Sequence, residues 1–77
     1  MVIDSKLRWN CRRGMKELDT LLQRYLQQHY VTAPAEEQAA FAKLLELPDP
    51  QLWAYFSGRD KPSDPIYLKL IERIITP

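Results

Sequence analysis

Glycine, cysteine and histidine are scarce in this chain of 77 residues, which holds two glycines, one cysteine and one histidine. Two glycines cannot build a glycine-rich phosphate loop, and one cysteine excludes an internal disulfide and a multi-cysteine metal site. His29 has no second histidine at metal-ligand spacing, and its place on the apolar stripe of a predicted helix favours packing or helix capping. These absences argue against a catalytic centre, a resident cofactor and a metal site.

Charge and hydrophobicity exclude further classes of protein. The formal net charge is +1, from 11 Lys and Arg against 10 Asp and Glu, and a dedicated nucleic-acid binder carries a stronger positive field. No apolar run approaches the roughly 18 residues of a membrane span, and Asp4 interrupts the opening before a signal peptide could form. We therefore expect a cytoplasmic protein that does not insert into a membrane, consistent with its lack of disulfides.

Apolar residues recur at helical spacing along almost the whole sequence, and no stretch alternates as a β-strand would. The pattern predicts an all-α fold of about five helices, packed as a small orthogonal or irregular bundle in one domain over residues 1–77. The expected helices are a short one through Leu7 to Cys11, the longest from Met15 to His29, one after Pro34, one from Asp49-Pro50 to Gly58, and one from Asp64-Pro65 to Ile75. In the last two, we expect the aspartate to cap the helix and the proline to begin it.

The run Arg12-Arg13-Gly14-Met15-Lys16-Glu17 is the most informative part of the sequence. A glycine inside a helix-forming segment costs about 1 kcal/mol relative to alanine, so its presence needs a reason. A purely structural role explains Glu17, because a carboxylate near the start of a helix is stabilised by the helix dipole, but it does not explain Arg13. An interaction surface explains both, since glycine lets another protein's backbone approach while guanidinium and carboxylate fix its register.

Two other features near this run leave alternatives open. Trp9 lies within a basic segment, where it either closes the bundle or anchors an interface. Cys11 lacks a neighbouring general base, so we expect a small, semi-buried helix residue and no enzymatic activity. The alternative function is a nucleic-acid-binding or antitoxin-like regulatory module, in which the basic segment contacts phosphates and Trp9 stacks on a base; its acidic neighbours Asp4, Glu17 and Asp19 argue against this.

The stretch from Arg13 to Glu17 resembles the Arg-Gly-x-x-Glu motif of the succinate dehydrogenase assembly factor 2 family, the bacterial flavinylation factors. The likeness extends along the chain through Trp9, the Cys11 to Met15 run, Glu17-Leu18-Asp19, Leu44-Leu45-Glu46, Asp49, Leu52 and Lys61-Pro62. The resemblance implies a helical bundle that binds the flavoprotein subunit of succinate dehydrogenase or of fumarate reductase. It further implies that the factor promotes covalent attachment of FAD to a histidine of that subunit.

Carried over residue by residue, the resemblance places Arg13, Gly14 and Glu17 at the partner surface, with Trp9, Arg12, Met15 and Asp19 as their neighbours. It implies no catalytic, cofactor-binding or metal-binding residue in this chain. FAD would be attached to the client protein and not held stably by the factor, which we expect to be monomeric when free.

Overall fold

The computed structural model describes residues 5–76, and within that range it contains five α-helices and no strand. The helices are α1 (Ser5–Asn10), α2 (Lys16–Tyr25), α3 (Ala35–Leu44), α4 (Asp49–Phe56) and α5 (Pro65–Ile75). The longest predicted helix is present, but its last turn is a π-helical segment, η1 (Leu26–Tyr30), that directly continues α2. The prediction of an all-α bundle is confirmed. No helix in residues 5–76 is both long and apolar enough to cross a membrane.

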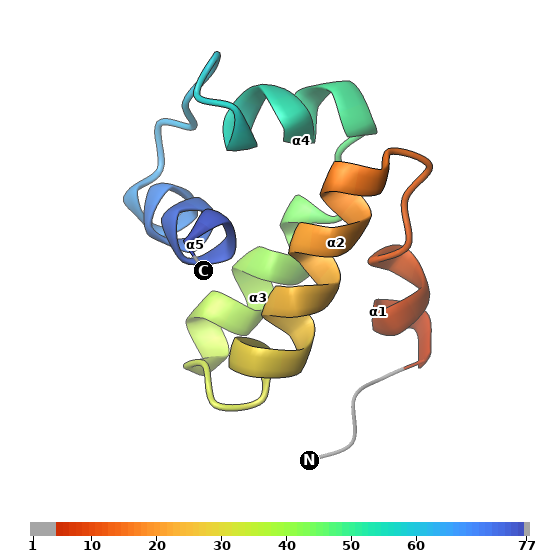
Figure 1. Cartoon of the computed structure of the whole chain (residues 1–77). Coiled ribbons are helices and arrows are strands. Elements are labelled where there is room, and N and C mark those ends of the chain that lie inside the picture. The colour runs from red at the N-terminus through yellow and green to blue at the C-terminus, as the bar shows by residue number, and fades with distance from the viewer. Residues whose placement is uncertain (1–4, 77) are drawn as a thin grey trace.

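The helices enclose one small core. Figure 1 shows α2 and α3 near the centre of the molecule, with α4 across one end of them, α5 on one side and α1 on the other. α5 packs against α2, α3 and α4, and α4 also packs against α2. As a result, the turn between α1 and α2 lies at one edge of the molecule, and the loop after α4 lies at the opposite edge (Figure 1).

The core is formed by the apolar stripes that the sequence predicts. Leu18, Leu22 and Tyr25 of α2 are fully buried, as is Phe41 of α3, whose ring centroid lies 4.6 Å from that of Tyr25. Each such apolar side chain contributes about 1.5–3 kcal/mol through removal of its surface from water. The Tyr25 hydroxyl donates a hydrogen bond of 2.5 Å to Glu37 Oε2, so the buried phenol is satisfied.

The predicted helix ends are partly confirmed. Asp64 caps α5 by accepting a hydrogen bond from the Ile66 backbone N at 3.1 Å, and Gly58 ends α4 with a φ of 83°. The prediction that Asp49 caps α4 is wrong, because Pro48 occupies the N-cap position and Asp49 lies in the first turn. The carboxylate of Asp49 is instead paired with Arg13, far away in the sequence.

Candidate functional site

The chain leaves α1 through a turn that is fixed by a buried cysteine. The Cys11 backbone N donates to the carbonyl oxygens of Leu7 and Arg8, at 3.2 and 3.3 Å, and the Cys11 side chain is fully buried. Sequence reasoning expected a semi-buried helical residue, whereas Cys11 lies in the turn after α1. Burial raises the pKa of the Cys11 thiol to about 11, so the thiol stays protonated near neutral pH and is a poor nucleophile.

Arg13 turns its guanidinium towards the junction between α3 and α4. Nη1 donates to the Leu47 carbonyl oxygen and to Asp49 Oδ1, both at 3.4 Å, and Nη2 donates to the Leu45 carbonyl oxygen. The side chain is only 15% exposed. Carbonyl groups past the end of a helix lack partners in the helix itself, and a cation there is also favoured by the helix dipole. The guanidinium of Arg13 therefore joins the end of α3 to the start of α4.

Asp19 holds the backbone of the same residue. Its Oδ1 accepts a hydrogen bond from the Arg13 backbone N at 3.1 Å and another from Gln23 Nε2 at 3.0 Å. Asp19 lies in the first turns of α2, so this contact ties the preceding turn to the start of that helix. Residue 13 is thus fixed at its backbone by α2 and at its side chain by the α3–α4 junction.

Gly14 is exposed, and the fold itself does not require a glycine at this position. A Cβ built on Gly14 would meet no heavy atom of the described residues within 4 Å. Its φ is also outside the positive range, since Gly58 alone has a positive φ among residues 5–76. Neither backbone conformation nor internal packing explains the absent side chain. The backbone at residue 14 is therefore open to solvent.

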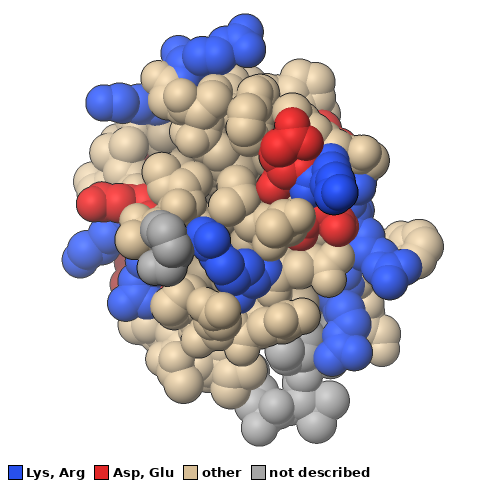
Figure 2. Space-filling view, in the orientation of Figure 1, with Lys and Arg blue, Asp and Glu red and all other residues tan. Residues whose placement is uncertain are grey.

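Several exposed side chains lie within five residues of Gly14 in the sequence. Trp9 is 70% exposed, which rules out its alternative role of closing the bundle. Arg12 and Glu17 are also exposed, and within residues 5–76 neither forms an ion pair. Figure 2 shows Lys and Arg side chains gathered on the side of the molecule where α1 and the following turn lie, with Asp and Glu side chains beside them. We call Trp9, Arg12, Gly14 and Glu17 the Gly14 surface.

The residues implicated by the sequence therefore divide into two groups. The Gly14 surface is presented to solvent, whereas Arg13 and Asp19 face into the fold, and Met15 is half-buried against the core. The sequence interpretation placed Arg13 at the partner surface beside Glu17, whereas the structure turns its guanidinium towards Asp49. Lys16, which belongs to the run singled out in the sequence but was not expected at the partner surface, is also exposed.

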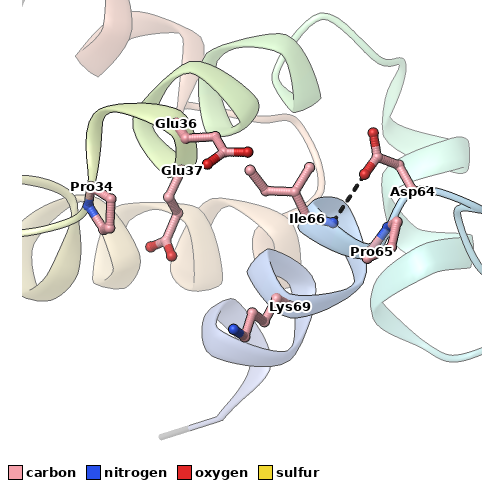
Figure 3. A pocket seen from close by; sticks show the side chains of 7 residues that line it. All are labelled: Pro34, Glu36, Glu37, Asp64, Pro65, Ile66 and Lys69. Carbon is pink, nitrogen blue, oxygen red and sulfur yellow. Dashed lines mark hydrogen bonds between the residues drawn. The ribbon is translucent and has the colours of Figure 1, made fainter.

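A separate hollow lies between the first turns of α3 and α5. It has a volume of about 420 Å³ and is lined by Pro34, Glu36, Glu37, Asp64, Pro65, Ile66 and Lys69 (Figure 3). Two of its carboxylates already act within the fold. Asp64 caps α5, and Glu37 accepts from Tyr25 and pairs with Arg73 at 3.5 Å. Glu37 and Asp64 thus have structural roles in helix capping and packing, and we take the Gly14 surface as the candidate site.

Comparison with known proteins finds relatives along almost the whole chain. A family model described as "Flavinator of succinate dehydrogenase" matches residues 5–76. A protein of Coxiella burnetii named "FAD assembly factor SdhE" is 39% identical over 69 residues, covering 90% of this chain and 84% of the relative. Proteins of the same name from Methylococcus capsulatus and Pseudomonas aeruginosa are 41% and 40% identical, over 90% and 91% of this chain and 83% of each relative. No solved structure matches the chain significantly.

Proposed function

Because the chain belongs to the family of succinate dehydrogenase flavinators, we propose that it binds the flavoprotein subunit of succinate dehydrogenase and promotes covalent attachment of FAD to that subunit. The observation that carries this proposal is the Gly14 surface. There, a glycine that the fold does not need lies within five residues of exposed aromatic, cationic and anionic side chains. Such a surface offers a large apolar anchor, a close approach to backbone, and charges that fix register.

The proposed action is indirect. A docked partner stabilises whichever conformation of the client it binds best, and this raises the population of that conformation. The histidine that receives FAD, the flavin pocket and the groups that stabilise charge during bond formation then belong to the client. The single cysteine of the factor supports this view, because the Cys11 thiol is buried and protonated near neutral pH. The factor itself is proposed to be non-catalytic and to hold no flavin stably.

The finer details of the proposal concern the range of clients and the state of the free factor. We propose that the flavoprotein subunit of fumarate reductase is a second client, and that the free factor is a cytoplasmic monomer. The alternative of a nucleic-acid-binding or antitoxin-like module finds no support in the comparisons. It is also weakened by Arg13, because the guanidinium that would contact a phosphate is engaged with the α3–α4 junction.

The proposal is tested by capture of the client from a lysate of the host organism. Tagged wild-type protein, Gly14→Arg, Glu17→Ala and the control Arg59→Glu are each used as bait, and in-gel flavin fluorescence identifies captured flavoprotein. Arg59 is exposed and follows α4 at the edge of the molecule away from α1, so this control changes surface charge at a distance from the Gly14 surface (Figure 1).

We expect wild type and Arg59→Glu to retain a flavoprotein subunit, and Gly14→Arg and Glu17→Ala to lose it while melting nearly as the wild type does. Capture of no flavoprotein by the wild type would overturn the proposed function. If Gly14→Arg and Glu17→Ala fail to fold, their role is structural. A second measurement, titration of the purified factor with FAD, should show no stoichiometric binding at micromolar concentration.

A further inference from the structure

Arg13 connects three parts of the fold, namely the turn before Gly14, the end of α3 and the start of α4. From this geometry we propose that Arg13 and Asp19 are positioning residues, which hold the turn before Gly14 in the shape that docks onto the flavoprotein subunit without touching it themselves. This inference rests on the proposed function and deepens it. It divides the family motif in this chain into a side chain that shapes the surface, Arg13, and residues that contact the partner, Gly14 and Glu17.

The guanidinium of Arg13 points into the fold and not towards a partner. A guanidinium recognises a partner carboxylate through its planar fork of N–H donors. In Arg13, both terminal nitrogens already donate to acceptors at the α3–α4 junction, on Leu45, Leu47 and Asp49. The Nε atom is buried and has no acceptor among the described residues. A partner carboxylate would therefore have to displace existing hydrogen bonds of a side chain that is only 15% exposed.

The parts of the fold that Arg13 connects lie far apart in the sequence. The side chain of Arg13 contacts groups 32 to 36 residues further along the chain, while its backbone N is held by Asp19, six residues away. Residues 12–14 lie between α1 and α2 and belong to neither helix, although the Arg12 backbone N still donates to the Trp9 carbonyl oxygen at 3.0 Å. The Arg13 and Asp19 contacts thus supply restraints just where the backbone precedes Gly14.

Restraints on the turn before Gly14 should strengthen binding to the client. Each residue that becomes ordered on binding costs conformational entropy, and a surface that is fixed beforehand avoids that cost. If release of Arg13 lets one or two residues of the turn move freely, association with the client should weaken by about 10- to 100-fold. The positioning role therefore predicts a large effect on binding from a side chain that makes no contact with the client.

Arg24 offers a matched control in the same chain. Its Nη2 donates to the carbonyl oxygens of Ile74 and Thr76 at 2.7 and 3.2 Å, so it too places a guanidinium on carbonyls at the end of a helix. It connects α2 to the end of α5 and does not contact the turn before Gly14. Arg24→Gln should therefore destabilise the fold in a similar way to Arg13→Gln, but it should leave the Gly14 surface in shape.

The experiment measures two properties of the full-length wild type, Arg13→Gln, Arg13→Lys, Asp19→Ala and Arg24→Gln. The first is the dissociation constant for the purified flavoprotein subunit of succinate dehydrogenase. The second is the rate at which a thiol reagent labels Cys11, which is buried at the start of the same turn and so reports its opening. Labelling rates are compared at denaturant concentrations that give each variant the same global free energy of unfolding, which removes the contribution of global unfolding.

We expect Arg13→Gln and Asp19→Ala to bind about 10- to 100-fold more weakly than Arg24→Gln and to label faster than it at matched stability. Arg13→Lys, which retains a donor and a charge, should recover part of both properties. Labelling of Arg13→Gln no faster than that of Arg24→Gln would overturn the proposal. Weak binding by Arg13→Gln with Cys11 still protected would also overturn it, because that result marks Arg13 as a direct contact.

The two proposals fail in different ways. Should the wild-type factor not bind the flavoprotein subunit at all, the proposed function falls. The labelling comparison, which needs no partner, would still decide whether Arg13 and Asp19 hold the turn. Should the wild type bind while Arg13→Gln and Arg24→Gln bind equally well, the positioning role falls and the proposed function stands.

Discussion

The two glycines of this chain should respond in opposite ways to the same substitution. At Gly14 an added Cβ meets no described heavy atom within 4 Å and the backbone is not in the left-handed region, so alanine fits. By restricting the unfolded chain, Gly14→Ala should raise the free energy of unfolding by about 0.4–1 kcal/mol. At Gly58, with a φ of 83°, alanine should lower it by about 1–2 kcal/mol.

Binding should change in the reverse order. If a client backbone packs over Gly14, the new methyl group overfills that contact at a cost of about 1–3 kcal/mol, which weakens binding by about 5- to 150-fold. Gly58 ends α4 on the edge of the molecule away from α1, so Gly58→Ala should leave the affinity of the folded protein unchanged (Figure 1). Gly14→Ala should thus be more stable and bind less well, and Gly58→Ala should be less stable and bind normally.

Thermal unfolding followed by circular dichroism and calorimetric titration with the purified flavoprotein subunit measure the two quantities. For a domain of this size, 1 kcal/mol corresponds to about 4–8 °C in Tm, which is easily resolved. Full affinity in Gly14→Ala would refute the idea that glycine is present for close approach of a partner. A lowered Tm in Gly14→Ala would show that the fold does need this glycine, and the reasoning from internal packing would then be wrong.

Two further predictions concern the core. Tyr25→Phe should destabilise the fold by about 1.5–3 kcal/mol, because it removes a buried hydrogen bond to the Glu37 carboxylate, and chemical denaturation measures the loss. The Cys11 thiol has a folded pKa of about 11 against an ordinary value of 9.0, so the folded chain holds this proton more tightly than the unfolded chain. The stabilisation that this proton provides is therefore present below pH 9, and about 2 kcal/mol of it should be lost as pH rises to 11. Cys11→Ala should lack this part of the pH dependence, and an unchanged slope in that variant would assign the loss to other groups.

Local signals in the sequence were sufficient for most of the fold. The apolar stripes of α2, α3 and α5 depend on residue spacing within one helix. Each of these helices is found where the spacing predicts it. Gly58 and Asp64 act within a few residues of their own positions, so their roles as helix end and helix cap were also predictable. The same reasoning was wrong at Asp49, because its carboxylate pairs with Arg13, which is 36 residues away in the sequence.

Local sequence signals predict where the candidate surface lies, but not which of its residues are exposed and which turn into the fold. The presence of a glycine beside charged residues indicated an interaction surface around Gly14, and the structure leaves that surface open. Nothing in the local sequence separates Arg12, which is exposed, from Arg13, which is not. Their difference depends on where the α3–α4 junction lies in space, and a spacing pattern does not contain that information. The same limit applied to Trp9, whose exposure depends on how α1 lies against the bundle.

An indirect mechanism carries a quantitative requirement that Trp9 can meet. Raising a client conformation from about 1% to about 50% of the population requires the factor to bind it about 100-fold more tightly than the alternative, or about 2.7 kcal/mol. Burial of a tryptophan removes 150–250 Å² from water, and with Trp9 70% exposed, docking could gain about 3–4 kcal/mol from this one side chain. Contact with Trp9 in the competent conformation alone would therefore suffice.

This reasoning predicts that Trp9→Ala loses most of the acceleration of flavin attachment while its folding is nearly unaffected, because the removed side chain is exposed. It also predicts that the factor discriminates between states of the client, since any ligand that shifts a population must bind the two states differently. Dissociation constants for the client with and without noncovalent FAD, and after covalent attachment, measure that preference. If the affinities are equal in all three states while flavin attachment is still accelerated, then a population shift is not how this factor works.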